Sequence, residues 1–184
     1  MNKKRELVIC GEVFKSKRTH FAFESPYKQI RDMREFKKLC EFPNLESVSL
    51  NGTNINDIGL QYLGQCQGLT NLNLTFTPIS DKGIMHLVSL KNLKWLRLKD
   101  TNISNKSIPH FNQMEQLISL HIHETEIDGK DLKDLNLIHL EELLVDCDDD
   151  KDYETLLNLS KKLPNCDIVC KSVGVFRNGF FIKN

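Results

Sequence analysis

The sequence predicts an α/β solenoid, a fold in which one short strand-and-helix unit is repeated and stacked. The main observation is a leucine that returns at a constant step of 24 residues, at Leu45, Leu69, Leu93 and Leu117. Three and five residues after each of these leucines comes another aliphatic residue, and eight and ten residues after it come a threonine and an isoleucine. Self-similarity at one fixed period is typical of stacked-repeat proteins.

Each unit begins with the pattern Leu-x-x-Leu-x-Leu or a close variant, which alternates at the period of a β-strand whose aliphatic side chains point inward. A helix start should follow, because the next segment offers side chains that accept hydrogen bonds from free helix N–H groups. These capping residues are Asn56, Ser80, Ser104 and Asp128. Apolar residues spaced by three then line one side of a helical or 3₁₀ turn. The last of them form the column Cys66, Leu90, Met114 and Ile138, so we interpret Cys66 as a small buried apolar residue.

The 184 residues are enough for one domain with a sizeable core. We divide the chain into an N-terminal cap (1–42), the repeats (43–163) and a C-terminal strand and hairpin cap (164–184), because the open ends of a solenoid need covering. The repeats include a fifth, divergent unit that begins at Leu140 after a step of 23 residues.

Both caps have their own secondary-structure signals. Residues 7–14 and 20–24 predict two short strands that could pair as a hairpin. Ser25-Pro26 predicts the start of a helix. The apolar residues of this helix recur at helical spacing, at Ile30, Met33, Phe36 and Cys40. At the other end we expect a helix over 153–163, a strand over 163–170 and a hairpin with an Asn178-Gly179 turn, whose hydrophobic residues close the stack.

Charge and cysteine content narrow the function classes. The 25 basic and 25 acidic residues balance, so we expect neither nucleic acid nor a membrane surface as partner. No apolar stretch is long enough for a secretion signal or a membrane span. We therefore interpret the six cysteines as reduced thiols and expect a cytoplasmic protein. The composition, rich in Lys, Asn and Ile, is typical of a bacterial source.

The repeat pattern resembles the leucine-rich repeat family. The resemblance covers about residues 43–170, and the Thr-Asn-Ile-Asn-Asp-x-Gly-Leu form at 53–60 resembles the ribonuclease-inhibitor-like and bacterial short-repeat branches. It implies a right-handed, curved solenoid with parallel strands on the concave side and helices or 3₁₀ turns on the convex side. Members typically bind proteins and rarely catalyse reactions. The Thr53 column departs from the buried asparagine ladder of many members, so we expect different hydrogen bonding in that turn.

The outward strand positions of the third and fourth units carry the strongest recognition signal. The only tryptophan, Trp95, lies with Arg97 and Lys99 on one predicted strand, beside His121 and His123 on the next. Trp and Arg dominate the binding energy of many interfaces, so we predict a partner site there. Its remaining predicted members are Asn73, Thr75, Glu142 and Asp146. The alternative is that Trp95 packs under a cap or against its neighbours while the charges are only solvated.

Metal and catalytic sites have weaker support. His121 and His123, with Glu124 and Asp146 nearby, could bind zinc only if a third ligand were in place. The acidic run from Asp146 to Asp152 is not a calcium loop, because Lys151 replaces the turn glycine and Leu157 the final glutamate. Acids at a helix N-terminus explain this run better. Phosphate loops and nucleophile motifs are absent from the sequence, so we expect no enzyme and no cofactor.

The function predicted from the sequence is non-catalytic protein binding through the concave face. In its sharpest form the chain is an inhibitor, such as an immunity protein that neutralises a toxin or effector. The alternative is an adaptor or scaffold that recruits a partner without inhibiting it.

Overall fold

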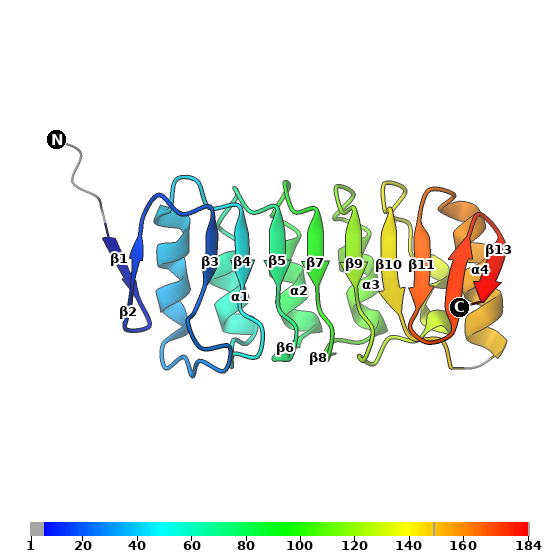
Figure 1. Cartoon of the computed structure of the whole chain (residues 1–184), viewed down its shortest axis with the longest axis horizontal. Helices are drawn as coiled ribbons and strands as arrows, with labels where there is room; N and C mark the ends of the chain where they lie inside the picture. Colours follow the sequence, from blue (N-terminus) through cyan, green and yellow to red (C-terminus); the bar gives the residue numbers. More distant parts are fainter. Residues whose placement is uncertain (1–5, 149, 184) are drawn as a thin grey trace.

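The main structural feature is one nine-stranded sheet, seen face-on in the computed structural model of the chain (Figure 1). The structure describes residues 6–148 and 150–183. The strand order is β13-β12-β11-β10-β9-β7-β5-β4-β3, and the strands from β3 to β11 run parallel. The parallel strands are β3 (His20–Ala22), β4 (Ser47–Ser49), β5 (Asn71–Asn73), β7 (Trp95–Arg97), β9 (Ser119–His121), β10 (Glu142–Val145) and β11 (Asp167–Cys170).

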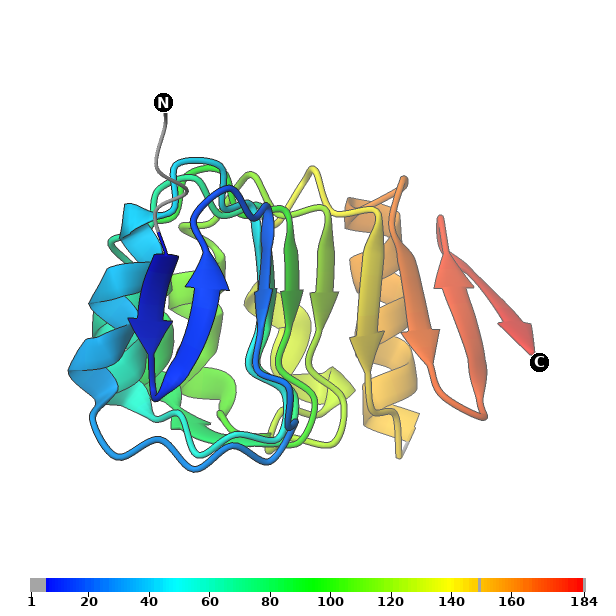
Figure 2. The same ribbon diagram turned by 60° about the vertical axis from the view of Figure 1, so that its left-hand side comes forward.

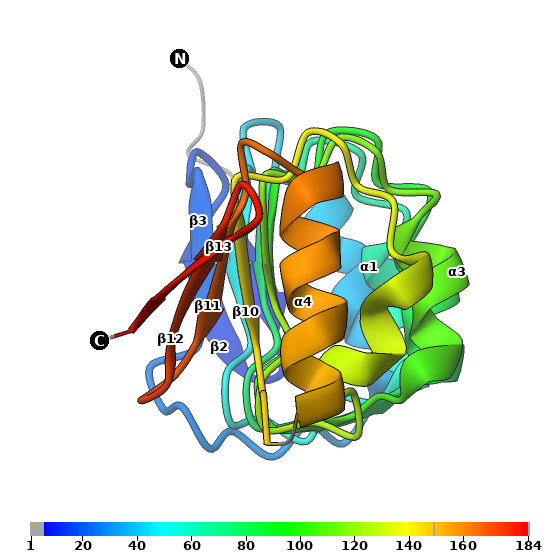
Figure 3. The same ribbon diagram turned by 90° about the vertical axis from the view of Figure 1, so that its right-hand side faces the viewer.

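Helices cover one face of this sheet and leave the other face open (Figure 3). They are η1 (Met33–Glu41), α1 (Asp57–Leu63), α2 (Asp81–Leu87), η2 (Asn105–Ser107), α3 (Ile108–Phe111), η3 (Gly129–Asp134) and α4 (Asp150–Lys162). Two short strands, β6 (Thr77–Ser80) and β8 (Thr101–Asn102), form a second parallel ladder at the start of the helical side. The α/β solenoid predicted from the 24-residue period is confirmed.

The core follows the predicted leucine columns. The central residue of each strand pairs in register with the next and is fully buried: Val48, Leu72, Leu96, Leu120 and Leu143. The helical column fails in the fourth unit, where Ile138 is 62% exposed and Leu137 is buried instead. That unit is one residue shorter than the others, so the inward position moves back by one residue.

The threonine column forms a hydrogen bond inside each repeat. Each hydroxyl donates to the backbone carbonyl three residues earlier. The four bonds are Thr53 to Leu50 (2.7 Å), Thr77 to Leu74 (2.6 Å), Thr101 to Leu98 (2.7 Å) and Thr125 to Ile122 (2.6 Å). A short hydroxyl therefore closes the turn within its own unit.

Aspartates at the start of α1 and α2 connect neighbouring repeats. The Asp57 carboxylate accepts from the backbone N of Ser80 (2.8 Å) and from its Oγ (2.6 Å). Asp81 accepts the same pair of bonds from Ser104 at 2.8 and 2.7 Å. The Ser80 side chain makes no capping bond to its own helix, contrary to prediction. Ser104 does cap, because its Oγ also accepts from the backbone N of Lys106 (3.4 Å). Asn56 does act as a cap, and its Oδ1 accepts from the first turn of α1.

The N-terminal cap differs from the prediction in two ways. The hairpin is formed by β1 (Glu6–Ile9) and β2 (Glu12–Lys15) as a separate sheet, whereas β3 joins the main sheet beside β4 (Figure 2). The helix begins at Met33, not at Ser25-Pro26. The preceding loop is held instead by Asn54, whose side chain bonds the backbone N (2.6 Å) and O (3.1 Å) of Ile30.

A disulfide between Cys40 and Cys66 links η1 to the segment after α1. The interpretation of all six cysteines as reduced thiols is therefore wrong for this pair. Cys66 is buried, as expected, but it also forms a covalent link. Cys40 is also exposed, because Leu39 takes the inward position of η1. The helices η1 and α1 pack side by side, which brings the two Cα atoms within 4.6 Å. Cys10, Cys147, Cys166 and Cys170 are not part of a disulfide in the described structure.

The C-terminal cap is a hairpin of β12 (Gly174–Arg177) and β13 (Phe180–Lys183). The predicted turn is confirmed, since Asn178 and Gly179 both have positive φ, at 46° and 78°. Phe176 and Phe181 pack against Tyr153 of α4, with ring centroids 4.9 Å apart in each pair, and cover the end of the core.

Two hairpin residues contradict the expected closing role. Phe180 is 72% exposed and Ile182 is 49% exposed, because they point away from α4. Within the acidic run, Asp152 is buried and accepts from the backbone N of Lys130 (2.6 Å) and of Asp148 (2.8 Å). Asp149 of this run lies outside the described residues. None of the helices in the described part of the chain has the length and apolar character of a membrane span.

Candidate partner-binding face

We call the open side of the sheet the concave face. Two rows of side chains cross it in hydrogen-bonded register, as the 24-residue period predicts. The first row is Ser47, Asn71, Trp95, Ser119 and Glu142, and the second is Ser49, Asn73, Arg97, His121 and Leu144. Neighbours in a row lie about 4.8 Å apart, so the predicted residues of β7, β9 and β10 form one continuous surface.

Trp95 stands at the centre of this surface and is 38% exposed. Its neighbours in the row, Asn71 and Ser119, are small and leave the indole open. The two caps lie several strands away on either side (Figure 1). Trp95 therefore does not pack under a cap, and its apolar ring is available to a partner.

The two cations beside Trp95 differ in their surroundings. Among the described residues, Arg97 has no carboxylate within ion-pair distance, and its side chain is exposed. Lys99 is held on both sides: its Nζ lies 4.9 Å from the centre of the Phe76 ring and 3.2 Å from Glu124 Oε2. Arg97 is the more available of the two charges.

His121, Ser119 and Glu142 converge on a single oxygen atom. Glu142 Oε2 lies 2.9 Å from His121 Nε2 and 2.7 Å from Ser119 Oγ. The hydrogen bond from His121, together with that from Ser119, holds the pKa of Glu142 below its usual range. Both groups donate to the carboxylate, so the histidine does not act as a base toward the serine. The arrangement positions Glu142 and is not a nucleophile–base pair.

His123 offers a partner much less surface than predicted. It is only 8% exposed, and its Nδ1 atom is buried without a hydrogen-bond partner. Burial lowers the pKa of His123, which favours the neutral ring. Asp146, the other predicted residue here, accepts a hydrogen bond from the backbone N of Glu124.

The zinc alternative gains no support from this geometry. The ring centroids of His121 and His123 lie 6.2 Å apart, and Nε2 of His121 contacts Glu142. Within residues 6–148 and 150–183, no group of three or more His, Cys, Asp or Glu side chains could hold a metal ion.

Asn73 and Thr75 form a polar margin on the N-terminal side of Arg97. Both are half-buried, and Asn73 Oδ1 accepts from the backbone N of Thr75 (3.1 Å). The bond fixes the direction of the Asn73 amide next to Arg97 on the adjacent strand.

Phe76 is a surface residue that the sequence pattern did not reveal. It is 48% exposed at the edge of the concave face and has a positive φ of 56°. The same repeat position is Gly52, Phe76, Asp100 and Glu124, and all four have positive φ. A bulky residue is costly in this conformation. Gly52 in the first copy is the signal that could have revealed the strained position.

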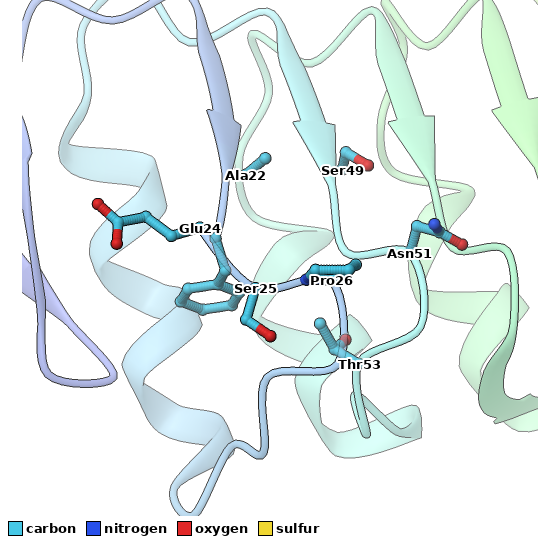
Figure 4. Close-up of a pocket in the computed structure, with 8 residues that line it drawn as sticks. Ala22, Glu24, Ser25, Pro26, Ser49, Asn51 and Thr53 are labelled. Carbon is cyan, nitrogen blue, oxygen red and sulfur yellow. The ribbon is translucent and has the colours of Figure 1, made fainter.

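A pocket of about 260 Å³ lies at the N-terminal end of the concave face. Figure 4 shows side chains from β3, the end of β4 and two loops around it, including Ala22, Ser25, Pro26 and Ser49. Its lining mixes polar and apolar side chains, and the pocket lies two strands away from Trp95. None of the predicted site residues lines it.

Comparisons with known proteins identify the fold. No protein-family model matches the sequence, and no curated protein matches it. Among solved structures, internalin C2 from Listeria monocytogenes matches with a TM-score of 0.54 and 22% identity, over 82% of this chain and 70% of that protein. An internalin (inlF) from the same organism matches with a TM-score of 0.54 and 21% identity, over 86% of this chain and 50% of that protein. The chain thus spans only half the length of the second protein. These likenesses show a leucine-rich repeat fold, as the repeat pattern implies.

Proposed function

We propose that this leucine-rich repeat chain is a non-catalytic protein-binding module whose concave face binds the partner. The observation that carries the proposal is Trp95, an exposed indole on a central strand with Arg97 two residues along the same face. An exposed tryptophan flanked by an available cation is typical of an interface, because Trp and Arg dominate the binding energy of many interfaces.

Energetic and geometric considerations both support this surface. Trp and Arg are enriched among interface residues whose truncation costs at least about 2 kcal/mol. The backbones of Trp95 and Arg97 lie in a hydrogen-bonded sheet. These residues are therefore already ordered before binding, and little conformational entropy is lost when a partner binds. Solenoids present an extended concave surface of this kind for binding. His121, Asn73, Thr75 and Glu142 would surround the two anchors.

The narrower proposal is that binding masks the partner, as an immunity protein masks a toxin or effector. An adaptor would use the same face and leave the partner active. Both forms predict contact at Trp95, and they differ only in what happens to the partner's activity.

A photo-crosslinking amino acid tests the surface. Introduced at position 71, beside Trp95 in the first row, it should capture a partner, whereas at Met85, which is 52% exposed on α2 of the helical side, it should not. Equal capture from both positions, or capture from position 85 alone, would contradict the proposal.

An activity assay on the captured partner then distinguishes the inhibitor from the adaptor. The partner's activity is measured with increasing amounts of the chain, wild type or carrying Trp95→Ala. Loss of activity with the wild type alone supports an inhibitor. Saturating binding with full activity retained supports the adaptor.

A further inference from the structure

The second row of the concave face continues beyond the predicted site as an unbroken aliphatic series. Leu144 of β10 pairs in register with Val169 of β11, which pairs with Val175 of β12, which pairs with Ile182 of β13. Four successive strands therefore place an aliphatic side chain at the same level of the sheet. The first three are half-buried, and Ile182 is 49% exposed.

This row lies on the open side of the molecule. Figure 3 shows the β12–β13 hairpin turning away from the helices, so that it extends the free face of the sheet. Phe180, which is 72% exposed, adds an aromatic ring on the same face of β13 as Ile182. The first row continues from Glu142 to Asp167 of β11 and Arg177 of β12. These two charges neutralise each other, because Arg177 forms an ion pair with Asp167.

Arg97, on the strand two places before this row, is a positive charge that a negatively charged partner group could pair with. The acids near Arg97 form their contacts with other groups: Glu142 with His121 and Ser119, and Glu124 with Lys99. Together with the hydrogen bond from His121, the Arg97 charge helps to lower the pKa of Glu142, but no ion pair joins Arg97 to Glu142. The neighbours of Arg97 in the row, Asn73 and His121, carry no negative charge. Among the described residues Arg97 is left without a carboxylate, and a carboxylate from outside would complete a charge-assisted hydrogen bond.

We propose that the partner presents a segment that crosses the strands, with an acidic side chain on Arg97 and aliphatic side chains along Leu144, Val169, Val175 and Ile182. This inference rests on the proposed function, because it names the chemistry of the partner that the concave face binds. With strands about 4.8 Å apart, the aliphatic contacts begin about 10 Å from Arg97 and end about 24 Å from it. An amphipathic helix of about 16 residues spans that length at 1.5 Å per residue.

The surface does not suit a nucleic acid. Such partners need several cations for successive phosphates. Here one available guanidinium is followed by an apolar row. A protein segment with one acidic residue and several aliphatic residues matches both the guanidinium and the apolar row.

Selection of peptides from a random library tests the inference without knowledge of the natural partner. Phage displaying random peptides of about 16 residues are selected against the folded wild type. Parallel selections use Arg97→Glu, Trp95→Ala and the double variant Val175→Thr/Ile182→Thr. A matched control carries Val8→Thr and Val13→Thr, a cross-strand pair that is 52% and 62% exposed at the opposite end of the molecule.

The wild type and the matched control should enrich peptides that combine Asp or Glu with several aliphatic residues. Arg97→Glu should reduce the acidic preference at least tenfold and replace it with a basic one. Val175→Thr/Ile182→Thr should remove the aliphatic preference and keep the acidic one.

An acidic preference that survives Arg97→Glu would overturn the inference, as would an aliphatic preference lost equally in the matched control. Failure to enrich any peptide would also contradict it. If enriched peptides depend on Trp95 but show neither preference, the partner chemistry is wrong while the proposed function stands. If no enriched peptide depends on Trp95, Arg97 or the aliphatic row, both fail.

Discussion

The Nε2 atom of His121 lies 2.9 Å from the Oε2 atom of Glu142, a contact that joins two neighbouring strands across the concave face. The same oxygen accepts a bond from Ser119 Oγ at 2.7 Å. Both bonds favour the ionised carboxylate, which is why the pKa of Glu142 lies below its usual range.

His121→Ala should therefore move the pKa of Glu142 upward toward its usual range, and the bond from Ser119 should prevent a complete return. NMR titration of the Glu142 carboxyl carbon measures this shift. An unchanged pKa in His121→Ala would show that the hydrogen bond from His121 is not its cause.

The same contact predicts a pH dependence of stability. A carboxyl whose pKa is lower in the folded state stabilises the fold above its unfolded pKa, and the stabilisation is lost as the pH falls through the folded pKa. The difference in free energy of unfolding between wild type and Glu142→Gln should be full at neutral pH and vanish in acid. Urea unfolding across this range, with the exposed Glu141→Gln as control, measures the difference. A difference that grew in acid would contradict this direction of the effect.

The threonine turns predict a specific loss of stability. Thr77→Val keeps the shape but leaves the Leu74 carbonyl without its 2.6 Å hydroxyl donor, and the site is only 3% exposed. Loss of such a buried bond costs about 1–3 kcal/mol. Thr75→Val, at a half-buried position on the concave side, is the matched control and should change the free energy of unfolding much less. Equal effects in urea unfolding would show that the turn bond is not the cause.

Phe76 predicts a separation of stability from binding. Its positive φ costs a non-glycine residue about 1–2 kcal/mol. Phe76→Gly removes this strain but also the ring contact with Lys99, worth about 0.5–1 kcal/mol at exposed sites. The free energy of unfolding should therefore change by less than about 1 kcal/mol, because the added flexibility of glycine opposes the relief of strain.

Binding of the partner should nevertheless weaken in Phe76→Gly. Asp100→Gly, at the next copy of the same position with φ of 51°, is the control that should keep binding. Equal binding by the wild type and both variants in a calorimetric titration would remove Phe76 from the interface.

The disulfide predicts both a thiol count and a stability loss. Alkylation of the protein unfolded without reductant should modify four cysteines and spare Cys40 and Cys66. The bond closes a loop across a sequence separation of 26 residues, so Cys40→Ser/Cys66→Ser should lower the free energy of unfolding by about 3 kcal/mol. Cys10→Ser is the control and should leave the bond intact. Alkylation of all six cysteines would contradict the assignment.

The repeat fold could be predicted because one period fixes many positions at once. The step from Leu45 to Leu69 sets the register of β4 against β5, and repetition carries it to β10. The caps follow no period, so their prediction was weaker. Ser25-Pro26 satisfies helix-start chemistry, yet Asn54 holds that loop through a tertiary contact that local signals do not contain.

The candidate site could be predicted in part for the same reason. The row that joins Asn73, Arg97 and His121 follows from the period alone. The burial of His123 does not, because it depends on how the turn after β9 folds. The Cys40–Cys66 bond depends on where η1 begins, and the aliphatic row depends on the register of the last hairpin.

The central claim is that Trp95 and Arg97 form the surface that binds the partner. The most direct measurement is the dissociation constant of the crosslinked partner for the wild type and for Trp95→Ala/Arg97→Ala, with urea unfolding to show that both proteins fold equally well. Loss of one such anchor costs at least about 2 kcal/mol, so we expect the double variant to bind at least about 30-fold more weakly. Undiminished binding by the folded double variant would contradict the account.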